Sequence, residues 1–216
     1  MSADLVFKRL LVLAAHPDDG EIGAGGLLSK LSGAVEAKKY VAFSSCGESV
    51  PDGFPADVLI HEMAEATKCL GFAEHERTVL DFSVRHFPAS RQDILEAMIA
   101  IKREYDPDLV LVPASYDIHQ DHAVVYQEAK RAFKDCTLLG YEMPWNCMDF
   151  KTDLLVELTE KNLSDKLKAI SCYKSQAFRS YGDGAPLAQL AALRGNQIKA
   201  PLAEAYEVIR WVWRAQ

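Results

Sequence analysis

Short continuous apolar runs alternate with longer segments of helical spacing along the first two-thirds of the chain. A continuous apolar run is typical of a strand buried on both faces, whereas apolar residues three and four apart predict a helix with one buried face. The predicted strands are Arg9–Ala15, Tyr40–Ser45, Thr78–Phe82, Leu109–Pro113, Leu138–Glu142 and Asp153–Leu158. The predicted helices are Glu21–Leu31, Val58–Leu70, Ser90–Tyr105, Asp121–Phe133 and Ser164–Tyr173.

This alternation predicts βαβ units, which right-handed crossovers join into a mainly parallel sheet with helices on both faces. We therefore expect an α/β fold of three layers. The sequence shows no repeat, no low-complexity segment and no linker, so residues 1–216 are predicted to form a single domain. The segment 178–204 is richer in Gly and Ala and less periodic, and we expect it to form a cap or an active-site loop region.

Composition narrows the class of protein. Of the 216 residues, 49% are hydrophobic and 25% charged, as in a soluble globular domain. The net charge of -7 argues against a nucleic-acid partner, which would require Lys and Arg to bind phosphates. No apolar run approaches the roughly 18 residues of a membrane span, and no signal peptide is recognisable. The five cysteines are scattered and never form a CxxC pair, which favours reduced thiols and a cytoplasmic location.

Two polar clusters each follow a predicted buried strand. The first is His16-Pro17-Asp18-Asp19, directly after the first strand, and the second is His119-Gln120-Asp121-His122, a few residues after Leu109–Pro113. The carboxyl ends of parallel strands meet at one edge of the sheet, where ligands bind in such folds. Packing does not explain charged residues there, because burying an unpaired charge is costly.

Together the clusters have the composition of a catalytic metal site. A catalytic zinc takes about three protein ligands from His and carboxylate side chains and keeps one position open. His16 and Asp19 lie three residues apart across a tight turn, and His122 can supply the third ligand. Asp18 then lies beside the metal as a general base for water. His119 can stabilise the oxyanion or protonate the leaving amine.

Asp121 can orient a histidine of this site by accepting its second ring proton. Each cluster also has a plainer interpretation when it stands alone. A His-x-Asp-His is often a helix cap with a surface salt bridge, and an Asp-Asp after a strand is often a helix N-cap. Two such clusters after two buried strands favour the metal site.

Other functions fit the sequence less well. Gly23-Ala24-Gly25-Gly26 is not a Gly-x-Gly-x-x-Gly fingerprint, and the carboxylates in the turn before it would repel a pyrophosphate. The glycines are better explained by close packing of a helix on the sheet. A two-metal phosphoesterase needs more ligands than the sequence offers. A different single-metal hydrolase and a catalytically silent metal-binding protein of the same fold are the remaining alternatives.

The motifs match a known family. Ala15–Gly23, combined with His119–His122, resembles the LmbE-like, or PIG-L, family of zinc-dependent N-deacetylases. The resemblance extends from about residue 9 to residue 180. It includes a Glu-led helix at Glu62–Gly71, a Pro-Asp-x-Val strand at Asp106–Pro113 and a Ser-Gln segment at Tyr173–Gln176.

The resemblance implies a Rossmann-like fold and one zinc ion per chain on His16, Asp19 and His122. It implies Asp18 as the base and His119 as the second catalytic group. Fe(II) is an alternative ion, because a His/His/Asp site accepts both metals. The implied substrate is a small amino sugar of the N-acetylglucosamine type, and the sequence leaves open whether it is free, nucleotide-linked, lipid-linked or glycosidic. The small bacillithiol-type members are closest in length, and their likeness implies a homo-oligomer.

The sequence departs from those relatives at Leu59, where they carry an arginine three residues before the leading Glu. Arg85 is our proposed replacement for that substrate contact, although a solvated surface arginine would look the same. Arg179 and Arg194 fall in the irregular C-terminal stretch and are proposed to bind a phosphate or carboxylate on the substrate.

Trp145 lies in Leu138–Asn146, a segment that most resembles family members found in polysaccharide or nucleotide-sugar gene contexts. The indole of Trp145 can stack on a sugar face, but it fits an ordinary core position equally well.

Overall fold

The computed structural model describes residues 7–213 of the chain. Within them one seven-stranded sheet has the strand order β3-β2-β1-β4-β5-β7-β6. The first five strands in that order are parallel, and β7 runs antiparallel to both β5 and β6. The strands are β1 Arg9–Ala14, β2 Ala37–Ala42, β3 Arg77–Val79, β4 Leu109–Pro113, β5 Thr137–Tyr141, β6 Leu154–Glu157 and β7 Ala203–Arg210.

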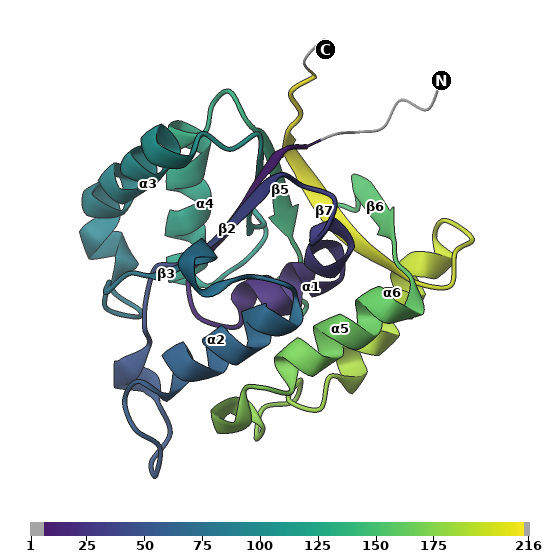
Figure 1. Cartoon of the computed structure of the whole chain (residues 1–216), viewed down its shortest axis with the longest axis horizontal. Coiled ribbons are helices and arrows are strands. Elements are labelled where there is room, and N and C mark those ends of the chain that lie inside the picture. The colour runs from purple at the N-terminus through teal and green to yellow at the C-terminus, as the bar shows by residue number, and fades with distance from the viewer. Residues whose placement is uncertain (1–6, 214–216) are drawn as a thin grey trace.

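Helices cover both faces of the sheet (Figure 1). One face carries α1 Asp19–Leu31, α2 Val58–Cys69, α5 Glu160–Ile170 and α6 Ala185–Asn196. The other carries α3 Arg91–Tyr105 and α4 Gln120–Ala132. Short 3-10 turns lie at Gly47–Ser49, Glu74–Glu76, Phe87–Ser90 and Lys174–Gln176. The predicted three-layer, Rossmann-like fold is confirmed. None of the helices in the described part of the chain has the length and hydropathy needed to cross a membrane.

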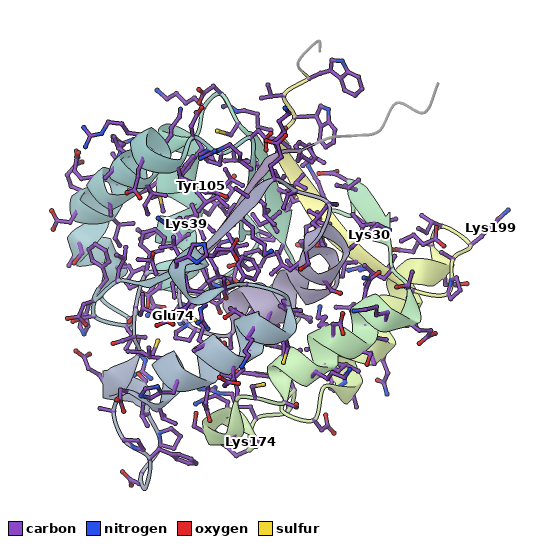
Figure 2. The ribbon with its side chains drawn as sticks, viewed as in Figure 1. Lys30, Lys39, Glu74, Tyr105, Lys174 and Lys199 are labelled. Carbon is purple, nitrogen blue, oxygen red and sulfur yellow. The ribbon has the colours of Figure 1, made fainter. Side chains whose placement is uncertain are left out.

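Strand β1 shows why the apolar runs are continuous. Leu10 and Val12 pack with α1 and α2, whereas Leu11 and Leu13 pack with α3 and α4 on the opposite face. All four side chains are buried because both faces of the strand are covered. Side chains fill the space between the sheet and its helices (Figure 2).

Helix α6 and strand β7 are absent from the sequence prediction. The expectation of an irregular segment is wrong for Ala185–Asn196, which is helical. Its alanines give little contrast between a polar and an apolar face, and Gly195 looks like a helix breaker. Gly195 is present because a Cβ there would meet the backbone of Ala200 and Leu202. Strand β7 escaped prediction because a charged residue, Glu204, interrupts its apolar run.

Glu204 is the centre of a buried polar cluster beside α1. Its carboxylate accepts the backbone N–H groups of Gly26 at 2.9 Å and Leu27 at 2.7 Å. It also accepts hydrogen bonds from Lys166 Nζ at 2.7 Å and from the Tyr206 hydroxyl at 2.7 Å. Because Lys166 balances the charge and four donors surround the oxygens, the carboxylate is satisfied within the protein.

The glycines of α1 let the helix lie very close to its neighbours. A Cβ at Gly23 would overlap the ring of Tyr141 on β5, and one at Gly26 would overlap Leu158. The Tyr141 hydroxyl in turn donates to the Leu13 carbonyl of β1 at 3.1 Å. These contacts account for the glycines by packing, as the sequence suggested.

Candidate functional site

The two polar clusters meet at the carboxyl edge of the sheet. Strands β1 and β4 are neighbours, so the segments that follow them leave the sheet side by side. The first segment leads into α1, which begins at Asp19. The second leads into α4, whose N-cap is His119. The topology therefore brings together residues that are about a hundred positions apart in sequence.

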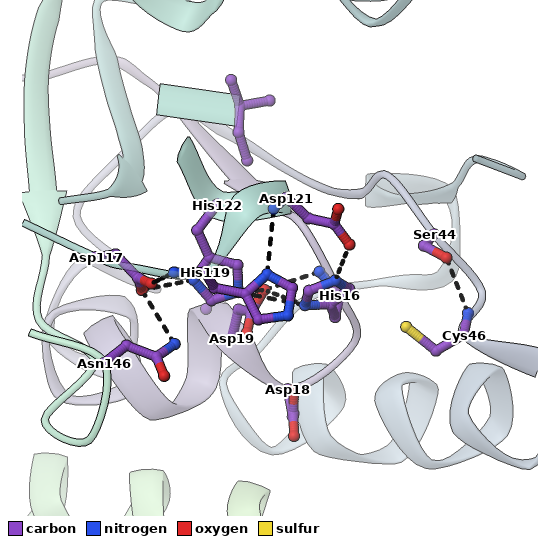
Figure 3. Close-up of polar contacts among 12 residues, drawn as sticks. His16, Asp18, Asp19, Ser44, Cys46, Asp117, His119, Asp121, His122 and Asn146 are labelled. Carbon is purple, nitrogen blue, oxygen red and sulfur yellow. Dashed lines mark hydrogen bonds and ion pairs between the residues drawn. The ribbon is translucent and has the colours of Figure 1, made fainter. Parts of the chain in front are cut away.

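Three hydrogen-bond acceptor atoms converge there, and we call them the acceptor triangle: His16 Nδ1, Asp19 Oδ2 and His122 Nε2 (Figure 3). His16 Nδ1 and His122 Nε2 are 3.2 Å apart. Asp19 Oδ2 lies 3.4 Å from His16 Nδ1 and 3.3 Å from His122 Nε2. The backbone N–H of His16 donates to the same Asp19 oxygen at 2.8 Å, which fixes the carboxylate.

Two further carboxylates contact the outer nitrogens of these histidines. Asp121 Oδ2 lies 3.0 Å from His16 Nε2, and Asp117 Oδ2 lies 2.6 Å from His122 Nδ1. An ionised carboxylate can only accept a hydrogen bond, so these contacts place the ring protons on the outer nitrogens. The lone pairs of the inner nitrogens then face Asp19.

The electrostatics of the triangle favour positive charge. Burial opposes a charge on His16, but the carboxylates of Asp19 and Asp121 outweigh it and raise its pKa to about 9. Burial likewise opposes a charge on His122, yet Asp19 and Asp117 raise its pKa to about 10. Burial would raise the pKa of Asp19, but His122 and His16 hold it well below its usual range.

Asp18 lies next to the triangle but outside it, with its side chain directed away from the histidines in Figure 3. It has a left-handed backbone (φ 93°) at the N-cap of α1 and makes no side-chain capping bond. The Tyr181 hydroxyl donates to Asp18 Oδ2 at 3.2 Å. Burial, with Asp19 and Glu21 nearby, raises the pKa of Asp18 well above its usual value.

His119 lies beside the two other histidines, with its ring centre 4.9 Å from that of His16 and 4.7 Å from that of His122. Its Nδ1 accepts the backbone N–H of Asp121 at 3.1 Å, so the neutral ring carries its proton on Nε2. Burial, with His122 and His16 nearby, lowers its pKa.

Two donor sets therefore overlap at the site. One is the acceptor triangle, and the other consists of the three histidines, each offering a nitrogen within 4.8 Å of the others. The triangle is the tighter set, with edges of 3.2 to 3.4 Å. In addition, one nitrogen of His119 is already engaged with the backbone of α4.

A pocket of about 240 Å³ opens over this cluster. Arg85, Trp145 and Arg179 line it, as does Leu59, the position marked above as a departure from the family pattern. The structure does not bring Arg194 there. Its guanidinium forms an ion pair with Glu142, with contacts of 3.1 and 2.5 Å.

Two residues of the site, Asp117 and Tyr181, are not evident from the sequence. Asp117 holds His122, and its only sequence signal is a carboxylate two residues before His119. Tyr181 stacks on Trp145 with ring centres 4.3 Å apart and planes 9° apart. It lies in the segment expected to be irregular, and nothing in its local sequence pairs it with Asp18.

Comparison with known proteins identifies the family. The family model described as PIG-L: GlcNAc-PI de-N-acetylase matches residues 11–133, more than half of the chain and both polar clusters. The chain belongs to the PIG-L family. YaiS of Escherichia coli K12, described as an uncharacterized deacetylase, is a PIG-L relative that is 30% identical over 177 residues. That match covers 78% of this chain and 91% of YaiS. This PIG-L protein is a hydrolytic N-deacetylase.

Solved structures share the fold. N,N′-diacetylchitobiose deacetylase from Pyrococcus horikoshii superposes with a TM-score of 0.77 at 23% identity, over 94% of this chain and 84% of that one. GalB, the 4-carboxy-2-hydroxymuconate hydratase of Pseudomonas putida KT2440, superposes with a TM-score of 0.76 at 18% identity, over 97% and 99%. Because a hydratase has the same fold, the fold alone does not select the reaction.

Proposed function

We propose that this PIG-L protein is a zinc-dependent hydrolase that removes the N-acetyl group from an amino sugar of the N-acetylglucosamine type. The observation that carries the proposal is the acceptor triangle. Zinc bonds of about 2.0–2.1 Å at tetrahedral angles separate two ligand atoms by about 3.3–3.4 Å. The three edges of the triangle are 3.2, 3.3 and 3.4 Å.

The donor chemistry supports the same ion. The triangle offers two imidazole nitrogens and one carboxylate oxygen, the set typical of a catalytic zinc, and Fe(II) is the alternative because it accepts the same ligands. Asp121 and Asp117 fix the ring orientation of His16 and His122. Zinc held there supplies a Lewis acid that lowers the pKa of water and polarises a carbonyl oxygen.

Asp18 is proposed to take the proton of the attacking water. Its carboxylate lines the pocket beside the triangle, where Tyr181 holds it in place, and burial raises its pKa and so its affinity for a proton. Hydrolysis breaks the amide C–N bond and forms a C–O bond from water, and the proton reaches the amine nitrogen.

His119 is proposed to donate a hydrogen bond from Nε2 to the oxygen that becomes negative. Its Nδ1 is occupied and its pKa is lowered, so the neutral ring is a donor at Nε2. In this scheme the proton that Asp18 takes from water goes on to the leaving amine nitrogen, and His119 acts as the hydrogen-bond donor.

The aromatic side chains in the pocket wall are consistent with a sugar substrate. Trp145 is 40% exposed, and Tyr181 supports it by stacking, so its outer face can pack on a sugar ring. Related proteins include the diacetylchitobiose deacetylase named above, whose substrate is built from N-acetylated amino sugars.

The experiment is an assay for free amine and acetate released from N-acetylglucosamine, diacetylchitobiose and UDP-N-acetylglucosamine. We expect amine and acetate in equal amounts, loss of both after chelation, and recovery with zinc. Anaerobic Fe(II) serves as the comparison for the metal. Absence of acetate from every N-acetyl sugar, or full activity after complete metal removal, would overturn the proposal. The single domain, the cytoplasmic location and the homo-oligomer remain predictions from the sequence.

A further inference from the structure

Two arginines at the pocket have no acidic partner among the described residues. Arg85 and Arg179 both line the pocket above the acceptor triangle, and no carboxylate within residues 7–213 forms an ion pair with either guanidinium. Some arginines elsewhere in the chain are paired with carboxylates: Arg194 binds Glu142, and the buried Glu128 accepts hydrogen bonds from two arginines of α3 and α4. The two pocket arginines therefore have free hydrogen-bonding capacity at the site.

Arg85 is held in place by its backbone. Its N–H donates to Asp121 Oδ2 at 2.6 Å, and the N–H of Phe87 donates to the other oxygen of Asp121 at 3.3 Å. The backbone of Arg85 is left-handed (φ 69°), a conformation that costs energy for a side chain other than glycine. Since Asp121 also contacts His16, the position of Arg85 is fixed relative to the acceptor triangle.

Arg179 is held through its side chain. Its Nε donates to Gln176 Oε1 at 2.7 Å, and its guanidinium lies over the ring of Phe178, 5.3 Å from the centroid. A guanidinium has five N–H groups, so four remain for another acceptor. The amide of Gln176 is itself positioned, because its Nε2 donates to Ser175, which is bound to Glu62 of α2.

The proposed function does not define which group is attached to the sugar. The two arginines indicate what kind of group it is. We propose that Arg85 and Arg179 bind an anionic group on the substrate, so that the enzyme acts on an N-acetyl amino sugar carrying a phosphate or a carboxylate. This rests on the proposed deacetylase function and specifies its substrate class. The planar guanidinium matches the oxygens of both groups.

This assignment requires the two guanidinium groups to offset the negative charge around them. Asp18 and Asp19 line the same pocket, and the whole chain carries a net charge of -7. An anionic substrate would be repelled on approach unless local positive charge offset that field. The anionic group undergoes no bond change, because the arginines bind it away from the acetamide that is hydrolysed.

The test compares kcat/KM for N-acetylglucosamine with that for N-acetylglucosamine 1-phosphate, UDP-N-acetylglucosamine and N-acetylmuramic acid. We expect the best anionic substrate to exceed N-acetylglucosamine by about tenfold or more, and the advantage to shrink as salt is added. Comparing the phosphates with the carboxylate then shows which anion is preferred. An equal or better rate on N-acetylglucosamine overturns the inference, whereas no deacetylation of any sugar overturns the proposed function instead.

Substitutions locate the effect. Arg85→Ala and Arg179→Ala should each raise KM for the best anionic substrate about tenfold, because an exposed charge-assisted contact is worth roughly that factor. The increase in KM for N-acetylglucosamine should be much smaller than the increase for the anionic substrate, and the Lys variants should recover part of the loss. Arg103→Ala, an exposed arginine of α3 outside the pocket, is the matched control. Equal KM increases for neutral and anionic sugars would show that the arginines only shape the pocket, and would overturn the inference.

Discussion

Two clusters of buried charged residues lie along α1. They differ in whether hydrogen-bond donors or acceptors point toward the centre of the cluster. Around Glu204, beside the middle of the helix, four donors point inward at one carboxylate and Lys166 balances its charge. In the acceptor triangle, at the start of the helix, Asp117 and Asp121 accept hydrogen bonds from the outer ring N–H groups of the two histidines. Three acceptor atoms are left facing one another.

This difference distinguishes a buried charge that only supports the fold from a set of groups that is arranged to bind a cation. A buried carboxylate with internal donors is complete as it stands and contributes to one defined arrangement of the core. A set of converging acceptors is complete only with a cation, whether protons on the histidines or a metal ion. Burial alone does not distinguish the two clusters, but the direction of their donors does.

The largest effect is expected from His122→Ala, which removes one corner of the triangle and tests whether the triangle holds a metal ion. We expect zinc to fall from about one ion per chain to a small fraction. Deacetylation should fall by about a thousandfold or more, since the metal contributes several kcal/mol to the transition state. Metal analysis and an amine-release assay measure both. His75→Ala, which alters an exposed histidine, should change neither. Unchanged zinc in the His122 variant would refute the assigned ligand set.

Asp18→Asn tests whether the carboxylate beside the triangle moves protons without holding metal. The expected result is full zinc content with kcat reduced by about 10²–10⁴-fold, the usual contribution of a general base. Loss of zinc from this variant would instead make Asp18 a ligand, and full activity would remove it from the mechanism.

Lys166→Met breaks the Glu204 cluster and should affect stability alone. Removing one partner of a buried ion pair costs about 3–5 kcal/mol of unfolding free energy, which urea denaturation can measure. Zinc content and kcat of the folded protein should not change. Lys161→Met on the same helix removes an exposed pair with Asp165 and should cost under about 1 kcal/mol. A Lys166 variant that loses zinc would contradict the separation of the two clusters.

Asp117→Asn probes the outer layer of the triangle and has the smallest expected effect. The amide keeps the size of the side chain but loses its charge, so zinc affinity should fall about 10–100-fold. Competition with a chromophoric chelator measures that change. Asp52→Asn, in an exposed loop, serves as the control. An affinity equal to that of the unchanged protein would show that Asp117 does not support His122.

The sequence predicted the parallel part of the fold well, because buried strands and amphipathic helices leave local patterns. Leu109–Pro113 was predicted with its observed bounds. The sequence also predicted which residues lie at the edge of the sheet, because His16 and His122 each follow closely on a buried strand. That inference needs only the rule that parallel strands end together.

What remained hidden depends on contacts between distant segments. Asp117 is an ordinary loop carboxylate until the fold places it against His122, and Tyr181 reaches Asp18 from 163 residues away. The sequence suggested that Arg194 binds an anion on the substrate, but its guanidinium forms an ion pair with Glu142. A sequence pattern records the periodicity of one element, whereas these pairings are set by tertiary structure.

The close packing at Gly23 has a consequence for how much sequence change the site can tolerate. A single methyl group there would overlap Tyr141 and would push α1 away from the sheet. Asp19 is the first residue of that helix, only four positions earlier. A metal site requires its ligands to be held to within roughly half an ångström. Adding a single methyl group at Gly23 would therefore shift Asp19 and weaken the proposed metal site.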